Sequence, residues 1–397
     1  MNMRQFFQQR VEEIYNNLVD IRRYLHTHPE LSYQEEKTMQ YVSGILKELG
    51  ISHTTNVGGF GIVGIIEGKN PSSKTIALRG DMDALPITEK NDVPYKSCNV
   101  GVMHACGHDV HTTNLLGAAI LLNEVKDQLN GTIKLIFQPA EERLPGGASI
   151  MIKDGVLENP KVETIVGQHV LPQMEVGKVG FRPGIYMASC DEIFIKVKGN
   201  GGHGAQPNLT IDTVLVASHI VVALQQIVSR NANPILPTVL SIGKIIGDGA
   251  TNVIPGEVYM EGTLRTFDEK WRAQAKTLIR KIVEGVGEAM GAEIELIIED
   301  GYPYLQNEDA LTLQSIEWAK EYLGEENVEL LPIRMTAEDF SYYTQIVPAC
   351  FYRLGTGNIS KGITSSIHTP TFDIDEAALK IGAGLMAWLA YQQLKGE

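Results

Sequence analysis

One stretch of the chain concentrates side chains that bind metals. One thiol and three imidazoles lie within the eight residues from His104 to His111, and they include Cys106 and His108. Cysteine thiolate and neutral histidine are the ligands that zinc and related ions prefer in proteins. The alternative is a histidine-rich surface loop, and this stretch alone favours a metal site only slightly. The remaining ligands must come from elsewhere in the chain.

Further candidates follow short apolar segments, at 75–78, 132–137 and 164–167, that are typical of buried strands. In open α/β sheets, functional sites form outside the carboxyl ends of the strands. We therefore expect the ionisable side chains past these strands, with one near the C-terminus, to converge. They are Asp81, Asp83, Glu141, Glu142, His169 and His368. With Cys106 and His108, this set suits two divalent ions about 3.5–4 Å apart.

The adjacent pair Glu141 and Glu142 is the most informative of these candidates. Neighbouring side chains after a strand point to opposite sides, so one carboxylate can bind a metal while the other addresses a bound water. A metal lowers the pKa of that water to about 7, and a carboxylate base can then move its proton to a leaving nitrogen. The alternative is a charged, solvated turn. The position after Gln138-Pro139-Ala140 at a strand end favours function.

Helical patterns alternate with these strands, as in α/β domains. Apolar residues at steps of four and three from Phe7 to Leu25 predict one long amphipathic helix, and a second helix is predicted over 35–49. Asp109 is expected to cap a helix that runs to about Leu129.

Two features near helix ends are given local roles. His26 is expected to interact with the dipole at the C-terminal end of its helix, and Thr336 with Asp339 resembles a capping box. A last helix is predicted over 376–393.

The pattern changes near residue 187, where alternating apolar residues replace the continuous apolar runs. The predicted order is β-α-β-β-α-β, the ferredoxin-like split unit. Its elements are strand 191–199, helix 210–230, strands 238–247 and 251–266, helix 268–290 and strand 293–298. We therefore predict a first part of one domain at 1–186, an inserted domain at 187–299, and a second part at 300–397.

Composition limits the classes of function. The chain has 397 residues, 43% apolar and 21% charged, with a formal net charge of -14. An acidic surface repels phosphates, so nucleic acids and anionic membranes are not expected as partners. Cys98, Cys106, Cys190 and Cys350 show no disulfide-like framework, which favours a reducing compartment. The N-terminus has no signal-like core and no apolar run approaches the ~20 residues of a membrane span, so we expect a soluble cytoplasmic protein.

Five motifs, in consistent order, resemble the M20 metallopeptidase family. The match is to its amidohydrolase branch, which includes hippurate hydrolases, N-acyl-amino-acid deacylases, N-acetyl-diaminopimelate deacetylases and auxin-conjugate hydrolases. The Cys-Gly-His-Asp and Pro-Ala-Glu-Glu motifs are specific in combination. The resemblance runs from about residue 22 to the final helix. The motifs lie at 79–86, 103–109, 138–142, 168–170 and 367–368.

This resemblance implies a mixed-sheet, aminopeptidase-like α/β catalytic domain with two divalent metal ions. It also implies an inserted ferredoxin-like lid through which the protein forms a homodimer. The implied reaction cleaves N-acetyl, N-benzoyl or similar N-acyl amino acids, or a short peptide, into a carboxylate and a free amino acid. A thiolate, three imidazoles and a carboxylate tolerate zinc, manganese, cobalt or nickel. The implied ligands are Cys106, which is a candidate bridge, His108, Glu142, His169 and His368.

By the same resemblance, Glu141 is the general base that activates a metal-bridging water. Asp81 and Asp83 occupy the segment in which the family keeps an acid that orients a ligand. The sequence leaves open which of the two does so, and an ion pair with Arg79 is the alternative for either.

The inserted domain carries three more implied site residues. His203 resembles a family histidine that reaches the active site of the partner subunit and steadies the oxyanion. Asn252 and Arg265 resemble substrate contacts, and Arg265 suits a two-pronged bond to a carboxylate. Each of the three has a polar loop or strand-end role as its alternative. His104 and His111 are expected to be structural.

Three other readings compete with an N-acyl-amino-acid amidohydrolase. A carboxypeptidase or dipeptidase could use the same metals. A non-catalytic protein could keep the metals for stability, although the intact Glu141 argues against that. Cys106 could also act as a thiol nucleophile, in which case chelation would leave the enzyme active.

Overall fold

The computed structural model describes residues 2–395 of the chain. The chain divides into two compact units. The first unit comprises Met1–Gly184, Gln306–Pro332 and Asp339–Glu397, and the second comprises Ile185–Leu305 and Ile333–Glu338.

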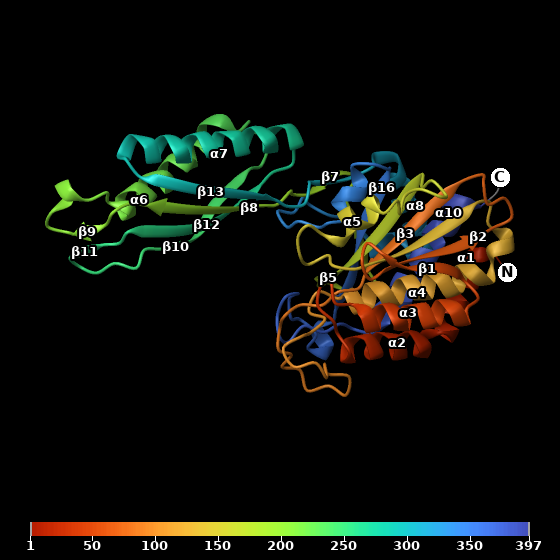
Figure 1. Cartoon of the computed structure of the whole chain (residues 1–397). Coiled ribbons are helices and arrows are strands. Elements are labelled where there is room, and N and C mark those ends of the chain that lie inside the picture. Colours follow the sequence, from red (N-terminus) through yellow and green to blue (C-terminus); the bar gives the residue numbers. More distant parts are fainter. Residues whose placement is uncertain (1, 396–397) are drawn as a thin grey trace. The chain divides into compact units, whose positions relative to one another are not determined.

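An eight-stranded mixed sheet forms the centre of the first unit (Figure 1). Its strand order is β1-β2-β4-β3-β5-β16-β6-β15, and β4, β3, β5 and β16 are mutually parallel. The strands are β1 (Ser52–Val57), β2 (Gly61–Glu67), β3 (Thr75–Asp81), β4 (Thr132–Gln138), β5 (Thr164–Glu175), β6 (Val179–Phe181), β15 (Val328–Leu330) and β16 (Ala349–Gly357).

The helices of this unit surround a central buried helix, α4. Every residue of α4 from His108 to Leu122 is buried, and the helix packs against β3, β5, α2 and α10. The bounds are α1 (Met3–Glu13), α2 (Tyr15–Thr27), α3 (Glu36–Glu48), α4 (His108–Glu124), α5 (Gly147–Lys153), α8 (Asp309–Leu323), α9 (Ser341–Thr344) and α10 (Ala377–Leu394).

The helix predictions for the first unit are confirmed with changes at the ends. The long N-terminal helix is two helices, α1 and α2, because the backbone of Ile14 departs from helical geometry, with φ −91° and ψ 1°. The predicted apolar face is nevertheless buried, from Phe7 to Leu25. Helix α3 lies within the predicted range, and α4 ends at Glu124, before the expected Leu129.

The parallel strands bring their carboxyl ends to one edge of the sheet, as the sequence predicted. Strand β3 ends at Asp81 and β4 ends at Gln138, just before Glu141. His169 differs from the prediction because it lies inside β5 rather than past its end. Strand β5 continues to Glu175 because β16 pairs with it along that length, with Arg353 opposite His169.

The second unit is a four-stranded antiparallel sheet of order β10-β12-β8-β13, which confirms the ferredoxin-like insertion. Helices α6 and α7 pack on one face of this sheet (Figure 1), against Ile193, Ile195 and Val197 of β8. The elements are β8 (Asp191–Lys198), α6 (Thr213–Gln226), β10 (Val239–Ile246), β12 (Glu257–Arg265), α7 (Glu269–Met290) and β13 (Glu293–Asp300), with a short pair β9 (Gly202–His203) and β11 (Val253–Ile254). Strands β7 (Gly184–Met187) and β14 (Leu305–Asn307) include the points where the chain passes between the units.

The boundaries of the second unit differ from the predicted 187 and 299. The chain returns to the first unit only after Leu305, because the Cys190 amide donates to the Tyr302 carbonyl oxygen at 2.9 Å. Residues 333–338 also belong to the second unit, since the Arg334 amide donates to the Tyr186 carbonyl oxygen at 2.8 Å.

Candidate metal centre

A glycine in the left-handed backbone conformation positions two predicted ligands, Cys106 and His108. Gly107 has φ +84° and directly precedes α4, so Cys106 ends the loop and His108 begins the helix. A Cβ at position 107 would lie 2.6 Å from Cγ2 of Val170, and a left-handed backbone is costly for other residues. The glycine therefore fixes the angle between the Cys106 and His108 side chains.

The structure brings all five predicted ligands together. Cys106 Sγ lies 3.4 Å from His169 Nε2 and 3.3 Å from His368 Nε2. Glu142 Oε1 lies 3.3 Å from His368 Nε2 and 3.8 Å from His108 Nε2. His368 comes from a distant segment, which its amide ties to the Ala105 carbonyl oxygen at 2.7 Å.

Hydrogen bonds fix two of the imidazoles in the state that binds a metal. His108 Nδ1 lies 3.1 Å from Asp83 Oδ1, and His169 Nδ1 lies 2.8 Å from the Val170 carbonyl oxygen. Both acceptors require a proton on Nδ1, which makes Nε2 the nitrogen that faces the cluster.

The chemistry of the cluster fits a divalent cation. His108 Nε2 and Glu142 Oε1 are buried and have no hydrogen-bond partner among residues 2–395. Burial and the charges of Glu142 and Glu141 raise the pKa of the Cys106 thiol well above its usual value. Burial lowers the pKa of His108, but Asp81, Asp83 and Glu142 outweigh it and raise that pKa to about 10. A cation would compensate these negative groups and compete with the His108 proton.

Glu141 lies close to one of the predicted ligands, His108. Its side chain is almost buried, and Oε2 lies 3.9 Å from His108 Nε2. Glu142 also contacts His368, whereas Glu141 Oε1 accepts from the Asp339 amide at 3.4 Å.

Asp83 is hydrogen-bonded to the candidate ligand His108, whereas Asp81 Oδ2 lies 3.8 Å from His108 Nε2. Asp83 Oδ1 faces His108, and Ser32 Oγ donates to Asp83 Oδ2 at 2.6 Å. The backbone amides of Glu141 and Glu142 each donate to the Asp83 carboxylate at 3.0 Å. Asp83 therefore links His108 to the turn that carries both glutamates.

Asp81 forms the ion pair with Arg79 that the sequence analysis gave as an alternative. Its carboxylate binds the Arg79 guanidinium and lies 2.5 Å from His111 Nδ1. Burial opposes its ionisation, but Arg79, His108 and His111 lower the pKa of Asp81 well below its usual value. His111 Nε2 in turn accepts the Val170 amide at 2.9 Å. Both nitrogens of His111 are therefore engaged by other protein groups, and its structural role stays a prediction.

Asp109 does not cap α4, which corrects the sequence prediction. The residue before the helix is Gly107, and Asp109 Oδ2 instead accepts from Arg22 Nε at 2.9 Å and lies 2.7 Å from His26 Nδ1. All three side chains are buried. Burial and Arg22 lower the pKa of His26, but Asp109 and Glu89 raise it above its usual value.

His26 therefore belongs to an internal charge network that sequence reasoning missed. Arg22 Nη2 also donates to Asp373 Oδ1 at 3.0 Å, which joins α2 to the segment after His368. The available signal was the four-residue spacing of Arg22 and His26 beside the buried Leu18–Leu25 stripe.

The predicted capping box at Thr336 and Asp339 is also wrong. No helix begins there, and Asp339 accepts from Arg79 Nη2 and Gln138 Nε2, both at 2.7 Å. The Asp339 carboxylate, which would have accepted a hydrogen bond in a capping box, is instead bound by the buried Arg79.

The three predicted site residues of the inserted domain all lie in the second unit. His203 and Asn252 are exposed on the β9–β11 pair and the turn before it, with the Gly204 amide donating to the Asn252 carbonyl oxygen at 2.8 Å. Arg265 ends β12, and its Nη1 is buried without a hydrogen-bond partner in the described part of the chain.

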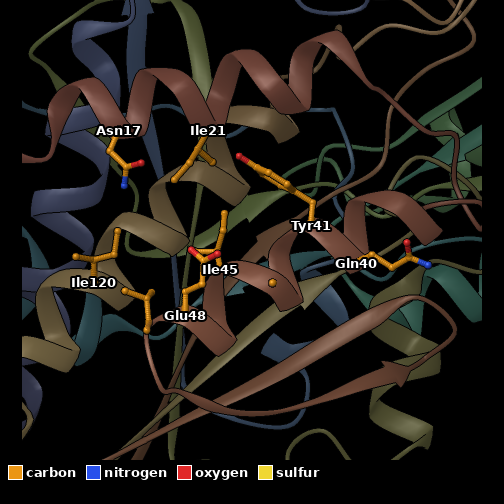
Figure 2. A pocket seen from close by; sticks show the side chains of 9 residues that line it. Asn17, Ile21, Gln40, Tyr41, Ile45, Glu48 and Ile120 are labelled. Carbon is orange, nitrogen blue, oxygen red and sulfur yellow. The ribbon is translucent and has the colours of Figure 1, made fainter.

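Two of the hollows in the first unit are compared with the candidate centre. One, of about 190 Å³, adjoins the candidate centre and is lined by Leu31, Ser32, Gln34, Ala84, Leu85, Pro86, Glu142 and Arg143. Figure 2 shows the other, of about 530 Å³, which α2, α3 and α4 line with Asn17, Ile21, Gln40, Tyr41, Gly44, Ile45, Glu48, Leu49 and Ile120. The second hollow contains none of the candidate site residues.

The chain is similar to known proteins in both sequence and structure. Residues 77–392 match the profile of peptidase family M20/M25/M40. An N-acyl-L-amino acid amidohydrolase of Geobacillus stearothermophilus is 42% identical over 299 residues, 75% of this chain and 80% of that protein. Thermostable carboxypeptidase 2 of Saccharolobus solfataricus is 41% identical over 389 residues, 96% of each chain. The crystal structure of a dinuclear metal binding peptidase of the M20 family from Bacillus subtilis has a TM-score of 0.80 and 33% identity, covering 96% of this chain and 99% of that chain.

Proposed function

Because this chain belongs to peptidase family M20/M25/M40, we propose that it is a metal-dependent amidohydrolase that releases amino acids from their N-acyl derivatives. The observation that carries the proposal is the convergence of five predicted ligand side chains with a further buried carboxylate, Glu141, whose Oε2 lies 3.9 Å from His108 Nε2. A purely structural metal site has no use for that additional carboxylate.

We assign two divalent ions to the cluster, of zinc, manganese, cobalt or nickel. Cys106, His108, His169, Glu142 and His368 would hold them, and Cys106 is our candidate for a ligand shared by both ions, which its contacts with two histidines support. When bound, such ions lower the pKa of a water to about 7 and polarise the amide carbonyl.

The side chains of this protein then move the proton. Glu141 accepts it from the water that attacks the amide carbon, and it delivers it to the nitrogen as the carbon–nitrogen bond breaks. The products are a carboxylate and a free amino acid. Asp83 is the acid that orients a ligand, since it faces His108 Nδ1 and holds the glutamate turn. We assign Asp81 an indirect role through His111 and Val170.

Three residues of the second unit are assigned to substrate recognition in this proposal. Arg265 has a guanidinium nitrogen without a partner in the described chain and suits the substrate carboxylate. Asn252 is assigned to the same substrate and His203 to the developing oxyanion. The acyl group fits the hollow beside Glu142, whose walls include Leu31, Leu85 and Pro86.

A carboxypeptidase or dipeptidase is the second candidate, and the similarity to a protein named as a carboxypeptidase favours it. We expect N-acetyl and N-benzoyl amino acids to be hydrolysed with a higher kcat/KM than dipeptides of the same C-terminal amino acid. Initial rates on a matched panel, repeated with each of the four metals, measure this. A higher kcat/KM on the dipeptides would assign the second function instead.

We further propose a homodimer through the second unit. Helix α6 exposes Leu215 and Val222, which are 48% and 73% exposed, and edge strand β10 exposes Ile245 and Ile246, which are 52% and 50% exposed. Segment Thr213–Asn231 has a mean hydropathy of 1.3 in its most apolar window, of which only 33% is buried. Helix α6 contacts β10, and we propose that these exposed apolar side chains contribute to a self-complementary interface.

The double variant Leu215→Glu, Val222→Glu is expected to be monomeric, because it places charges in this proposed interface. Sedimentation velocity should give twice 43.7 kDa for the wild type and 43.7 kDa for the variant. Leu313→Glu, on the exposed face of α8, is the matched control and should leave the dimer intact. If His203 acts in the partner's site, the monomer also loses activity; a fully active wild-type monomer would contradict both assignments.

The remaining proposals concern the protein's surroundings. All four cysteines are free, which is consistent with a reducing, cytoplasmic location. The net charge of -14 favours small substrates over nucleic acids or anionic membranes as partners.

A further inference from the structure

Three consecutive backbone amides of the turn after β4 are held by two buried carboxylates. The Ala140 amide donates to Glu35 Oε1 at 2.8 Å. The Glu141 and Glu142 amides donate to the two oxygens of Asp83, each at 3.0 Å. The turn that carries the proposed base and a proposed ligand is thus fixed at each of its residues.

Ala140 needs this support because of its backbone conformation. Its φ is +52°, in the left-handed region that residues other than glycine rarely occupy. Such conformations persist where surrounding contacts determine them, and they concentrate at functional sites. Both polar backbone groups of Ala140 are engaged, since its carbonyl oxygen also accepts the Gly147 amide at 2.8 Å. The strained residue aims the chain just before Glu141 and Glu142.

Glu35 has no comparable task in its own helix. It directly precedes α3 but makes no side-chain capping bond to it. The capping contact comes from Glu30, whose Oε2 accepts from the Thr38 amide at 2.8 Å. The Glu35 side chain is fully buried, and burial together with the Asp83 charge raises its pKa to about 7. Keeping a carboxylate here is unfavourable for stability, which argues that its contact with Ala140 is needed elsewhere.

We propose that Glu35 is a positioning residue, which holds the Ala140 amide so that Glu141 and Glu142 keep their places at the candidate centre. The inference rests on the proposed function, because it takes Glu141 as the base and Glu142 as a ligand. Glu35 acts at a distance from the reacting atoms, through one backbone hydrogen bond. The length of the Glu35 side chain therefore matters more than its charge.

Two conservative variants separate length from charge. Glu35→Gln keeps an acceptor oxygen at the same reach, so its kcat should stay within about threefold of the wild type. Glu35→Asp keeps the charge but is one methylene shorter and cannot reach the Ala140 amide. Its kcat should fall about 10- to 100-fold with KM changed less than about threefold, since a small displacement of a base is costly for the chemical step.

Glu30→Asp is the matched control, because it shortens a carboxylate of the same segment that supports α3 without contacting Ala140. Each variant is assayed as the metal-loaded full chain on one N-acetyl amino acid, with circular dichroism and bound metal measured in parallel. Glu30→Asp should lower the melting temperature without lowering kcat.

Several results would overturn the role of Glu35. They are an unchanged kcat in Glu35→Asp, an equal loss in Glu30→Asp, or a folded Glu35→Gln protein as impaired as Glu35→Asp. A wild type that hydrolyses neither N-acyl amino acids nor dipeptides contradicts the proposed function instead. In that case the cobalt affinity of the three variants tests the role of Glu35 separately. Only Glu35→Asp should bind cobalt more weakly, because the displaced turn moves the proposed ligand Glu142.

Discussion

Glu141→Gln is expected to lower kcat by about 10²–10⁴-fold, while bound metal stays at the wild-type level. Glutamine has the shape of glutamate but cannot accept a proton at neutral pH. The ligand cluster does not depend on Glu141, because Cys106, Glu142 and His368 contact one another directly. The variant should therefore bind substrate and metal and fail only in the proton transfer. Steady-state rates on an N-acetyl amino acid and metal analysis of the same sample measure both properties.

Glu142→Gln is the matched comparison, since it makes the same chemical change at the next residue. We expect it to lose metal as well as activity, because Glu142 Oε1 faces both His108 and His368. Retained turnover in Glu141→Gln would remove the assigned base. Loss of metal from Glu141→Gln, equal to that from Glu142→Gln, would make Glu141 a ligand instead.

The parts of this site that the sequence predicted are those with local signals. Gly107 marks the sharp entry into α4, and the apolar runs before Asp81 and Glu141 mark parallel strands whose ends must meet at one edge. The alternating pattern after residue 187 predicted strands with one exposed face. The order of these strands and the helices between them predicted the ferredoxin-like unit. Local periodicity and strand chemistry are sufficient for these inferences.

The parts that escaped prediction depend on contacts between distant segments. Asp109 has the form of a helix cap, but Arg22 lies 87 residues away in sequence and takes its carboxylate. Asp339 likewise resembles part of a capping box in the sequence, but in the fold its carboxylate accepts hydrogen bonds from Arg79 and Gln138. Spacing in the sequence could not separate Asp81 from Asp83 either, because only the fold places one against His111 and the other against His108.

Glu35 illustrates the same limit. In the sequence it is one glutamate at the start of an amphipathic helix, and nothing local distinguishes it from its exposed neighbour Glu36. Its partner Ala140 is 105 residues away, and the left-handed conformation of that alanine has no sequence signal.

Removal of metal is expected to lower activity by several orders of magnitude, and it separates the proposal from a thiol mechanism. Reactive thiols occur in electropositive surroundings that lower their pKa. Cys106 lies in the opposite environment, where burial and two glutamates raise the pKa. We therefore expect Cys106→Ala to lose bound metal, and the wild type to be inactivated by a chelator.

The most direct test is a titration of chelator-treated, metal-free protein with cobalt or manganese while hydrolysis of an N-acyl amino acid is followed. We predict negligible activity at the start and saturation at about two equivalents of metal per chain. Full activity in the metal-free protein would contradict a metal-dependent amidohydrolase, and saturation at one equivalent would contradict the two-ion assignment of the Cys106–His368 cluster.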